Sequence, residues 1–212
     1  MGKNLIERLN EGPVLCAEGY LFAMERRGYL QAGAFVPEVV LEHPEVVSQL
    51  HREFIRAGTD VVQAFTYYAH REKMRLIGKE ELIEPLQKNA LQIAKDARDE
   101  FKDLDLLVCG DIANTNVWDP NDKKSNIECQ KMFEEQVQWA KEAGVDFVVA
   151  ETISWLEEMK IALKVIKDAG LIAVCNFSLK SKDKTRDDYT PGDACKILED
   201  NGADVVGLNC FR

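Results

Sequence analysis

The chain has 212 residues, 46% of them hydrophobic and 30% charged, with a formal net charge of −10. This composition is ordinary for a globular protein with a buried core, and the acidic excess argues against nucleic acid or an anionic membrane surface as the main partner. No apolar run approaches the roughly 18 residues of a membrane span, and the first residues, MGKNLIERLNEG, lack the signal-peptide and N-myristoylation patterns. The six cysteines form no CxxC pair, which favours free thiols, so we expect a cytoplasmic protein.

Apolar segments at a regular spacing predict six β-strands, which begin near residues 13, 59, 105, 145, 171 and 203. Three of them share one pattern: AGTDVVQAF, AGVDFVVAE and NGADVVGLN. In each, a glycine is expected to end a helix in the left-handed conformation, and a valine-rich strand follows. A helix end that leads directly into a buried strand is typical of a βαβ protein.

Apolar residues at helical spacing predict helices between these strands, at residues 43–58, 79–100, 129–144 and 154–170. Pro85 is expected to kink or divide the second of them. A long aromatic-rich loop is expected between the first two strands, and the charged segment 180–190 is interpreted as a solvated loop.

Buried strands alternating with helices predict a parallel sheet, either a doubly wound open sheet or a (β/α)₈ barrel. No GxGxxG follows the first predicted strand, and an elaborated first loop suits a barrel. At about 40 residues per unit, the chain would hold about six of eight units. We therefore predict an α/β fold of the (β/α)₈ TIM-barrel type, with about six units present, as a single domain over residues 1–212.

Chemistry in both architectures lies at the carboxyl ends of the strands. Superposing the three repeats puts Glu151 in one column with Asn209, and Thr152 in the next with Cys210. Glu151 is then either a functional carboxylate or a first-turn acid of the following helix. Cys210 is either a ligand or nucleophile, or a small buried side chain.

The segment AFTYYAHRE puts two aromatic residues, Tyr67 and Tyr68, after the second predicted strand, where they either line a pocket or cap the barrel. His70 in the same segment, and His51 upstream, lie on charged stretches. Both histidines are expected at the surface rather than as metal ligands.

LFAMERRGYLQAGAFVPEVVLEHPEVVSQLHREFIRAGTDVVQAFTYYAHREKM, with FVVAET and GLNC further on, resembles the homocysteine S-methyltransferase family, and within it the betaine–homocysteine type. The resemblance extends over essentially the whole chain. It implies a (β/α)₈ barrel that moves a methyl group from a betaine-like or sulfonium donor to the sulfur of homocysteine, giving methionine.

The family binds zinc through three cysteines, and the metal keeps the homocysteine sulfur as a thiolate. Cys210 resembles the first of these ligands, whereas the adjacent cysteine pair of the family does not occur in the chain. The chain thus resembles a barrel cut short after its sixth unit, with an incomplete zinc site. Residues 1–212 alone are then expected to be inactive, and no residue is assigned as catalytic.

Two alternatives follow from that incomplete site. In one, the chain is an inactive homologue that acts as a structural or interaction protein through its unclosed barrel. In the other, it is a binding module that keeps homocysteine recognition through Glu151. An unclosed sheet exposes its edges, so we expect a homo-oligomer or a chain stabilised by a partner.

The resemblance also implies roles for particular side chains. Glu151 matches the carboxylate that holds the homocysteine amino group. Phe35, Tyr67 and Tyr68 fall where betaine-type enzymes have aromatic residues around the donor, since aromatic faces attract quaternary ammonium groups. Thr152 stands in place of a tyrosine of the betaine type and resembles the ET of members that use sulfonium donors.

Asn209, in GLNC, is assigned to substrate binding by the same resemblance. The first strand of the family ends in DGG, with an aspartate that helps to organise the substrates. Here the corresponding residues are Ala17, Glu18 and Gly19, so the acid has moved by one position. A shift of one residue reverses the facing of a side chain along a strand, and Glu18 replaces the aspartate only if a loop brings it back.

Overall fold

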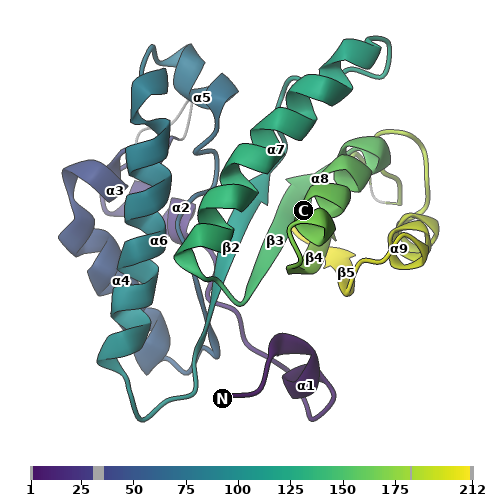
Figure 1. Cartoon of the computed structure of the whole chain (residues 1–212). Helices are drawn as coiled ribbons and strands as arrows, with labels where there is room; N and C mark the ends of the chain where they lie inside the picture. The colour runs from purple at the N-terminus through teal and green to yellow at the C-terminus, as the bar shows by residue number, and fades with distance from the viewer. Residues whose placement is uncertain (1, 31–35, 182, 211–212) are drawn as a thin grey trace.

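The computed structural model describes residues 2–30, 36–181 and 183–210 (Figure 1). Its sheet is parallel and follows the chain order, β1-β2-β3-β4-β5, with the strands Val61–Gln63, Leu107–Ala113, Phe147–Ile153, Ile172–Phe177 and Val205–Leu208. A doubly wound sheet reverses its strand order, whereas a barrel keeps it. The barrel-type α/β prediction is therefore confirmed. In the described part β1 and β5 are the two edges, so the sheet is not closed.

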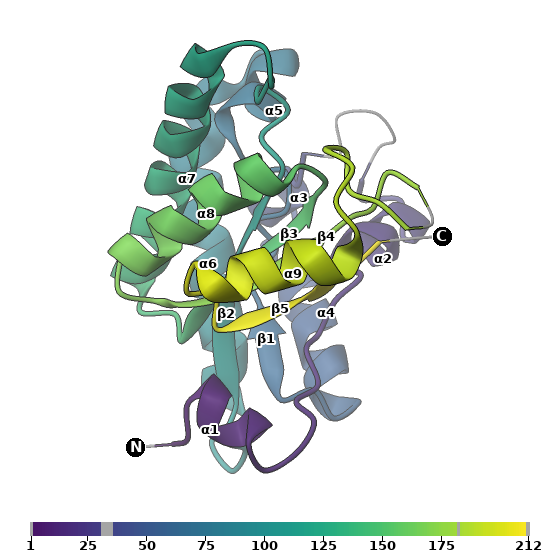
Figure 2. The same ribbon diagram turned by 90° about the vertical axis from the view of Figure 1, so that its right-hand side faces the viewer.

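The described helices are α1 (Leu5–Leu9), α2 (Tyr20–Arg26), α3 (Val39–Glu42), α4 (Pro44–Arg56), α5 (Arg71–Leu76), the 3₁₀ helix η1 (Glu80–Leu82), α6 (Ile83–Glu100), α7 (Lys123–Ala143), α8 (Leu156–Asp168) and α9 (Pro191–Asp200). Figure 1 shows α4, α6, α7 and α8 following one another across the sheet, and Figure 2 shows α9 beside β5. These helices cover the outer face. Among the described helices, none is long and apolar enough to cross a membrane.

The first of the six predicted strands, near residues 13–19, is reduced to one parallel bridge between Cys16 and Val61. The Ala17 N–H donates to the Val61 carbonyl at 3.1 Å, and the Val61 N–H donates to the Leu15 carbonyl at 3.1 Å. This segment pairs with β1 on one side only, and Leu15 is 59% exposed. Because a strand needs a longer ladder, the prediction of a full strand here is wrong.

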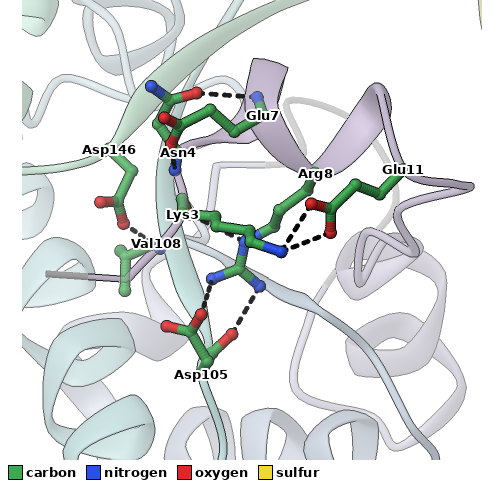
Figure 3. A network of polar contacts seen from close by, with 8 residues as sticks. All are labelled: Lys3, Asn4, Glu7, Arg8, Glu11, Asp105, Val108 and Asp146. Atoms are coloured by element: carbon green, nitrogen blue, oxygen red, sulfur yellow. Dashed lines mark hydrogen bonds and ion pairs between the residues drawn. The ribbon is translucent and has the colours of Figure 1, made fainter.

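Each of the three sequence repeats contains an aspartate that joins its strand to the preceding one. The Asp146 Oδ2 accepts from the Val108 N–H at 2.7 Å, and the Asp146 N–H donates to the Val108 carbonyl at 2.8 Å (Figure 3). The same two bonds join Asp60 to Leu15 and Asp204 to Ala173. The aspartates lie in the short helix–strand joints, between the end of each helix and the first residue of the strand. The strands therefore begin one or two residues later than predicted.

The glycine before each of these aspartates has the left-handed conformation that the sequence predicts. The φ angles are 100° at Gly58, 74° at Gly144 and 94° at Gly202. A side chain is strained in this region, and glycine is not. The chain can therefore leave a helix and enter a strand within about three residues.

Helix α1 covers the amino end of the inner face of the sheet. Leu5, 3% exposed, packs there with apolar strand residues. Asn4 and Glu7 form a capping box at the start of the helix. The Arg8 guanidinium donates to the Asp105 carbonyl at 2.5 Å and pairs with its carboxylate at 3.0 Å (Figure 3). This contact ties α1 to the segment that leads into β2.

The expectation for Pro85 is confirmed, because the predicted helix is divided into η1 and α6. Pro85 lies in the first turn of α6, where a missing N–H costs no helical bond. Two other local expectations need correction. The long first loop contains α2 and α3. The segment 180–190 is not simply solvated: Thr185 is buried, and the Asp187 carboxylate accepts from the Leu156 N–H at 2.8 Å, which caps α8.

Both histidines expected at the surface are buried. His51 lies on the inward side of α4, and its Nδ1 is 3.0 Å from the Tyr20 hydroxyl. His70 is the N-cap of α5. Helix periodicity places His51 on the buried side of α4. The capping position of His70 at the start of α5 turns its ring inward. The expectation of surface positions is wrong for both.

Candidate functional site

The inner face of the sheet changes from apolar to polar toward the carboxyl ends of its strands. The apolar layer includes Val61, Cys109, Phe147, Val149 and Val174. In β1 to β4 a polar side chain follows two residues after an apolar one and therefore lies on the same face. After β5 the polar side chain comes directly beyond the end of the strand. These side chains are Gln63, Asp111, Glu151, Asn176 and Asn209.

A pocket of about 260 Å³ lies at this polar end. Its lining combines three carboxylates, a wall of aromatic rings, an amide and a thiol. The residues are Glu18, Gly19, Tyr20, Leu21, Phe22, Gln63, Phe65, Tyr67, Tyr68, Asp111, Glu151 and Cys210. The described lining contains no lysine, arginine or histidine, so its charge is negative.

Glu151 is held on both carboxylate oxygens. Its Oε1 accepts from the Gln63 Nε2 at 2.9 Å, and its Oε2 accepts from the Asn209 Nδ2 at 2.6 Å. The side chain is only 8% exposed, and burial, followed by the charge of Glu18, raises its pKa. Helix α8 begins five residues later at Leu156, so the alternative interpretation of Glu151 as a first-turn helix acid is wrong.

Thr152 forms an irregularity in β3 directly after Glu151. The register of β3 against β4 shifts between Glu151 and Ile153, and Thr152 has φ 60°. Ile153 therefore packs in the outer core although Glu151 faces inward. The Thr152 N–H donates to the Asn209 Oδ1 at 3.0 Å, and the Asn209 Nδ2 donates to the Thr152 Oγ1 at 2.9 Å.

Two further residues of the pocket have left-handed backbones, Tyr68 with φ 60° and Cys210 with φ 47°. Such a conformation is strained for a residue other than glycine, and strain of this kind concentrates at functional sites. Thr152, a β-branched residue, is the most strained of the three. Of the five non-glycine residues with positive φ in the described part of the chain, Tyr68 and Cys210 line this pocket and Thr152 directly follows Glu151, whereas Asn116 and Asp188 lie outside the lining.

Asp111, at the carboxyl end of β2, was not among the candidates from the sequence. It is 3% exposed, and neither carboxylate oxygen has a hydrogen-bond partner in the described part of the chain. Burial, with the nearby Glu151 charge, raises its pKa well above the ordinary value. The sequence pattern that indicated Glu151 also applies to Asp111, because LLVCGD ends in an acidic residue after an apolar run just as FVVAE does. Gln63, a lone polar residue in an apolar strand, was missed as well.

Cys210 is exposed and lines the pocket, so the interpretation as a small buried side chain is wrong. Desolvation raises the pKa of its thiol. No group of three or more His, Cys, Asp or Glu side chains among the described residues is placed to hold a metal ion. A zinc site needs about four ligands, so the described residues do not fit zinc by themselves.

Glu18 reaches the pocket although its register differs from that of the family aspartate. Ala17 is buried, and the chain turns at Gly19, where φ is 83°, which leaves Glu18 on the lining. Tyr67 and Tyr68 also line the pocket. The Lys73 ammonium lies 4.0 Å from the Tyr68 ring centroid and already occupies one face of that ring. Phe35 lies outside the described residues.

A parallel barrel-type sheet with a charged and aromatic pocket at its carboxyl end defines a small-molecule site of the (β/α)-barrel class. The model of the family described as homocysteine S-methyltransferase matches residues 15–212. The chain belongs to this family.

Two curated relatives are betaine–homocysteine S-methyltransferases 1. The chain is 37% identical to the Bos taurus protein over 98% of its own length and 51% of that protein, and 37% identical to the Sus scrofa protein over 98% and 74%. It thus spans about half the length of the bovine relative. The Escherichia coli homocysteine methyltransferase MmuM, in its metallated form, superposes with a TM-score of 0.81 over 96% of this chain and 76% of that one at 20% identity, which supports the fold.

Proposed function

We propose that this chain provides the homocysteine-binding part of a zinc-dependent S-methyltransferase that moves a methyl group from a betaine-like or sulfonium donor to homocysteine, giving methionine. One observation carries the proposal beyond family membership: Glu151 and Cys210 line the same pocket. A carboxylate and a thiol in one small cavity match the two ends of homocysteine, its ammonium group and its sulfur. Family membership favours this enzymatic reading over a purely structural role.

Binding of homocysteine rests on the polar frame around Glu151 in this proposal. Gln63 and Asn209 fix the Glu151 carboxylate by hydrogen bonds at 2.9 and 2.6 Å, so little orientation is lost when a ligand arrives. Asn209 and Thr152, which the resemblance assigns to substrate binding, belong to that frame through the hydrogen bonds of the Asn209 amide. Glu18 faces the pocket from the opposite segment, in the role that the resemblance gives to an aspartate.

The zinc ion in this proposal is inferred from the resemblance to the homocysteine S-methyltransferase family. Cys210 would be one ligand, and a zinc ion there needs further ligands from outside the described residues, because these contain no metal-binding cluster. Two protein relatives are named for betaine, and aromatic residues on the pocket suit a cationic donor. Tyr67 and the free face of Tyr68 are the described candidates for that contact, with Phe35 as a further proposed member.

Glu151→Gln tests the proposed function. Loss of the charge removes a charge-assisted hydrogen bond to the ammonium group, worth about 1.5–3 kcal/mol, so the affinity for L-homocysteine should fall by at least about tenfold. Isothermal titration calorimetry on the purified chain measures this. The matched control is Glu128→Gln, an exposed position on α7. Equal affinity of wild type and Glu151→Gln would contradict the proposal, as would no binding by the wild type.

A further inference from the structure

Asp111 is a pocket acid that is buried without a hydrogen-bond partner on either carboxylate oxygen in the described part of the chain. The residue is only 3% exposed, and no described group pairs with its Oδ1 or its Oδ2. An isolated buried carboxylate is costly, and native proteins rarely retain one without a partner. The group therefore needs an explanation outside the described contacts of the fold.

Glu151, in contrast, has a partner on each of its oxygens. The Gln63 amide donates to the Glu151 Oε1, and the Asn209 amide donates to its Oε2. A carboxylate has about four acceptor positions, so Glu151 keeps part of its accepting capacity, whereas Asp111 keeps all of it. A ligand that donates several hydrogen bonds would thus find its largest unmet acceptor at Asp111.

Asp111 lies where a ligand in the pocket can reach it. It lies on the inner face of β2, between Gln63 on β1 and Glu151 on β3, and it lines the pocket of about 260 Å³. No cationic side chain is among the described lining residues. A cationic ligand would therefore supply the positive charge that no described lining residue supplies.

We propose that Asp111 is the specificity-determining carboxylate that binds the cationic, N–H-donating nitrogen of a small primary-ammonium ligand, with Glu151 as the second acceptor of the same subsite. A primary ammonium has three N–H donors, which suits two carboxylates on neighbouring strands. A quaternary ammonium or a sulfonium group has no N–H to donate. The identification of this ammonium group as that of homocysteine rests on the proposed function. The assignment of Asp111 to a primary ammonium group does not.

A metal ion explains the arrangement less well. The described acids of the pocket do not form a cluster that could hold a cation by direct coordination. The rest of the lining is largely aromatic, with Tyr20, Phe65 and Tyr67 among its members. Aromatic walls around a carboxylate pair suit an organic cation, whose carbon atoms they contact.

The test compares wild type, Asp111→Asn and the control Asp103→Asn, an exposed position before β2. Calorimetry measures binding of L-homocysteine and of 4-mercaptobutanoate, which has the same thiol and carboxylate but no amino group. Wild type and the control should prefer homocysteine by at least about tenfold. Asp111→Asn should lose that preference. If Asp111→Asn discriminates as well as wild type, the inference is overturned.

A second readout separates ligand recognition from a structural role. Removing an uncompensated buried charge should stabilise the empty protein, so Asp111→Asn should have a higher Tm than wild type without ligand, and Asp103→Asn an unchanged one. A lower Tm for Asp111→Asn would mean that Asp111 is structural and would overturn the inference.

The thermal-shift series also includes n-butylammonium chloride, which tests the ammonium subsite without a thiol. Stabilisation of wild type but not of Asp111→Asn by this probe, with no binding of homocysteine, would support the inference and refute only the proposed function. If wild type responds to neither n-butylammonium nor homocysteine, both fail.

Discussion

At the scale of single residues, His51 shows how burial changes the chemistry of a side chain. Its ring lies against Tyr20 with centroids 5.1 Å apart, and its Nε2 has no hydrogen-bond partner in the described part of the chain. Burial, followed by the charge of Arg52, lowers the pKa of His51 to about 3. His70 is buried as well, and its pKa is lowered to about 4.

These lowered values predict a loss of stability in mild acid. The folded-state pKa of His51 lies below the unfolded value of about 6.5, so the unfolded chain binds the extra proton and stability falls as the pH drops below about 6.5. The loss approaches about 1.4 kcal/mol per pH unit for each such histidine. His51→Gln should therefore lose less stability between about pH 7 and about pH 5 than wild type does.

Urea denaturation at the two pH values measures this slope. His43→Gln is the control, because His43 is half exposed and close to Glu45. The comparison between variants cancels the opposite contribution of the buried acids Glu151 and Asp111, whose raised pKa values add stability as the pH falls. Identical slopes for His51→Gln and wild type would refute the assignment.

Residue-scale reasoning from the sequence succeeded where a polar residue directly follows an apolar run, as Glu151 does. It failed for Asp111, although the same rule applies there, because the repeat that drew attention to Glu151 does not include β2. It failed for His51 because local charge was weighed above helix periodicity. Val47, His51 and Ile55 recur at a spacing of four and share the buried side of α4.

At the scale of elements, the repeated helix–strand joint is the unit from which this fold is built. Its glycine ends the helix, and its aspartate pairs with the start of the neighbouring strand through two hydrogen bonds. The glycine role was predictable, since it depends on local backbone geometry. The aspartate role was not, because its partner lies 38 residues away at Val108.

Asp146→Ala should therefore destabilise the protein. It leaves the N–H of the buried Val108 without a partner, which costs about 1–3 kcal/mol. Asp204→Ala should have an effect of the same size, because it leaves the N–H of the buried Ala173 without this bond. Asp60→Ala should have a smaller effect, because Leu15 is exposed and water can replace the lost bond to its N–H. Asp103→Ala should have little effect.

Chemical denaturation of the four variants measures these differences in stability. If the three joint variants are as stable as Asp103→Ala, the joint bonds contribute nothing to stability.

At the scale of the whole molecule, the sheet has two edges in the described part of the chain. β5 pairs with β4 alone, and Leu208 on it is 49% exposed. The segment at Cys16 makes a single bridge to β1. Unpaired strand edges tend to pair with other chains, so the expectation of a homo-oligomer or of stabilisation by a partner remains a prediction.

The native mass of the purified chain tests it, with zinc content measured on the same sample. We expect an assembly larger than the 24.0 kDa of one chain. Zinc held by such an assembly should be lost in Cys210→Ala, since Cys210 is the proposed ligand. A well-folded monomer would refute the assembly, and zinc retained by Cys210→Ala would refute the ligand.

The sequence by itself determined the alternation of helices and strands, the glycine joints, the barrel type and the family, because these depend on local periodicity and on long matched segments. It also indicated Glu151, Cys210 and the tyrosines as candidates. Only the tertiary structure decided that Asp111 is uncompensated and that Gln63 and Asn209 hold Glu151. Those facts depend on the register of the strands, which brings Gln63 and Asn209 to Glu151 from 88 and 58 positions away in the chain.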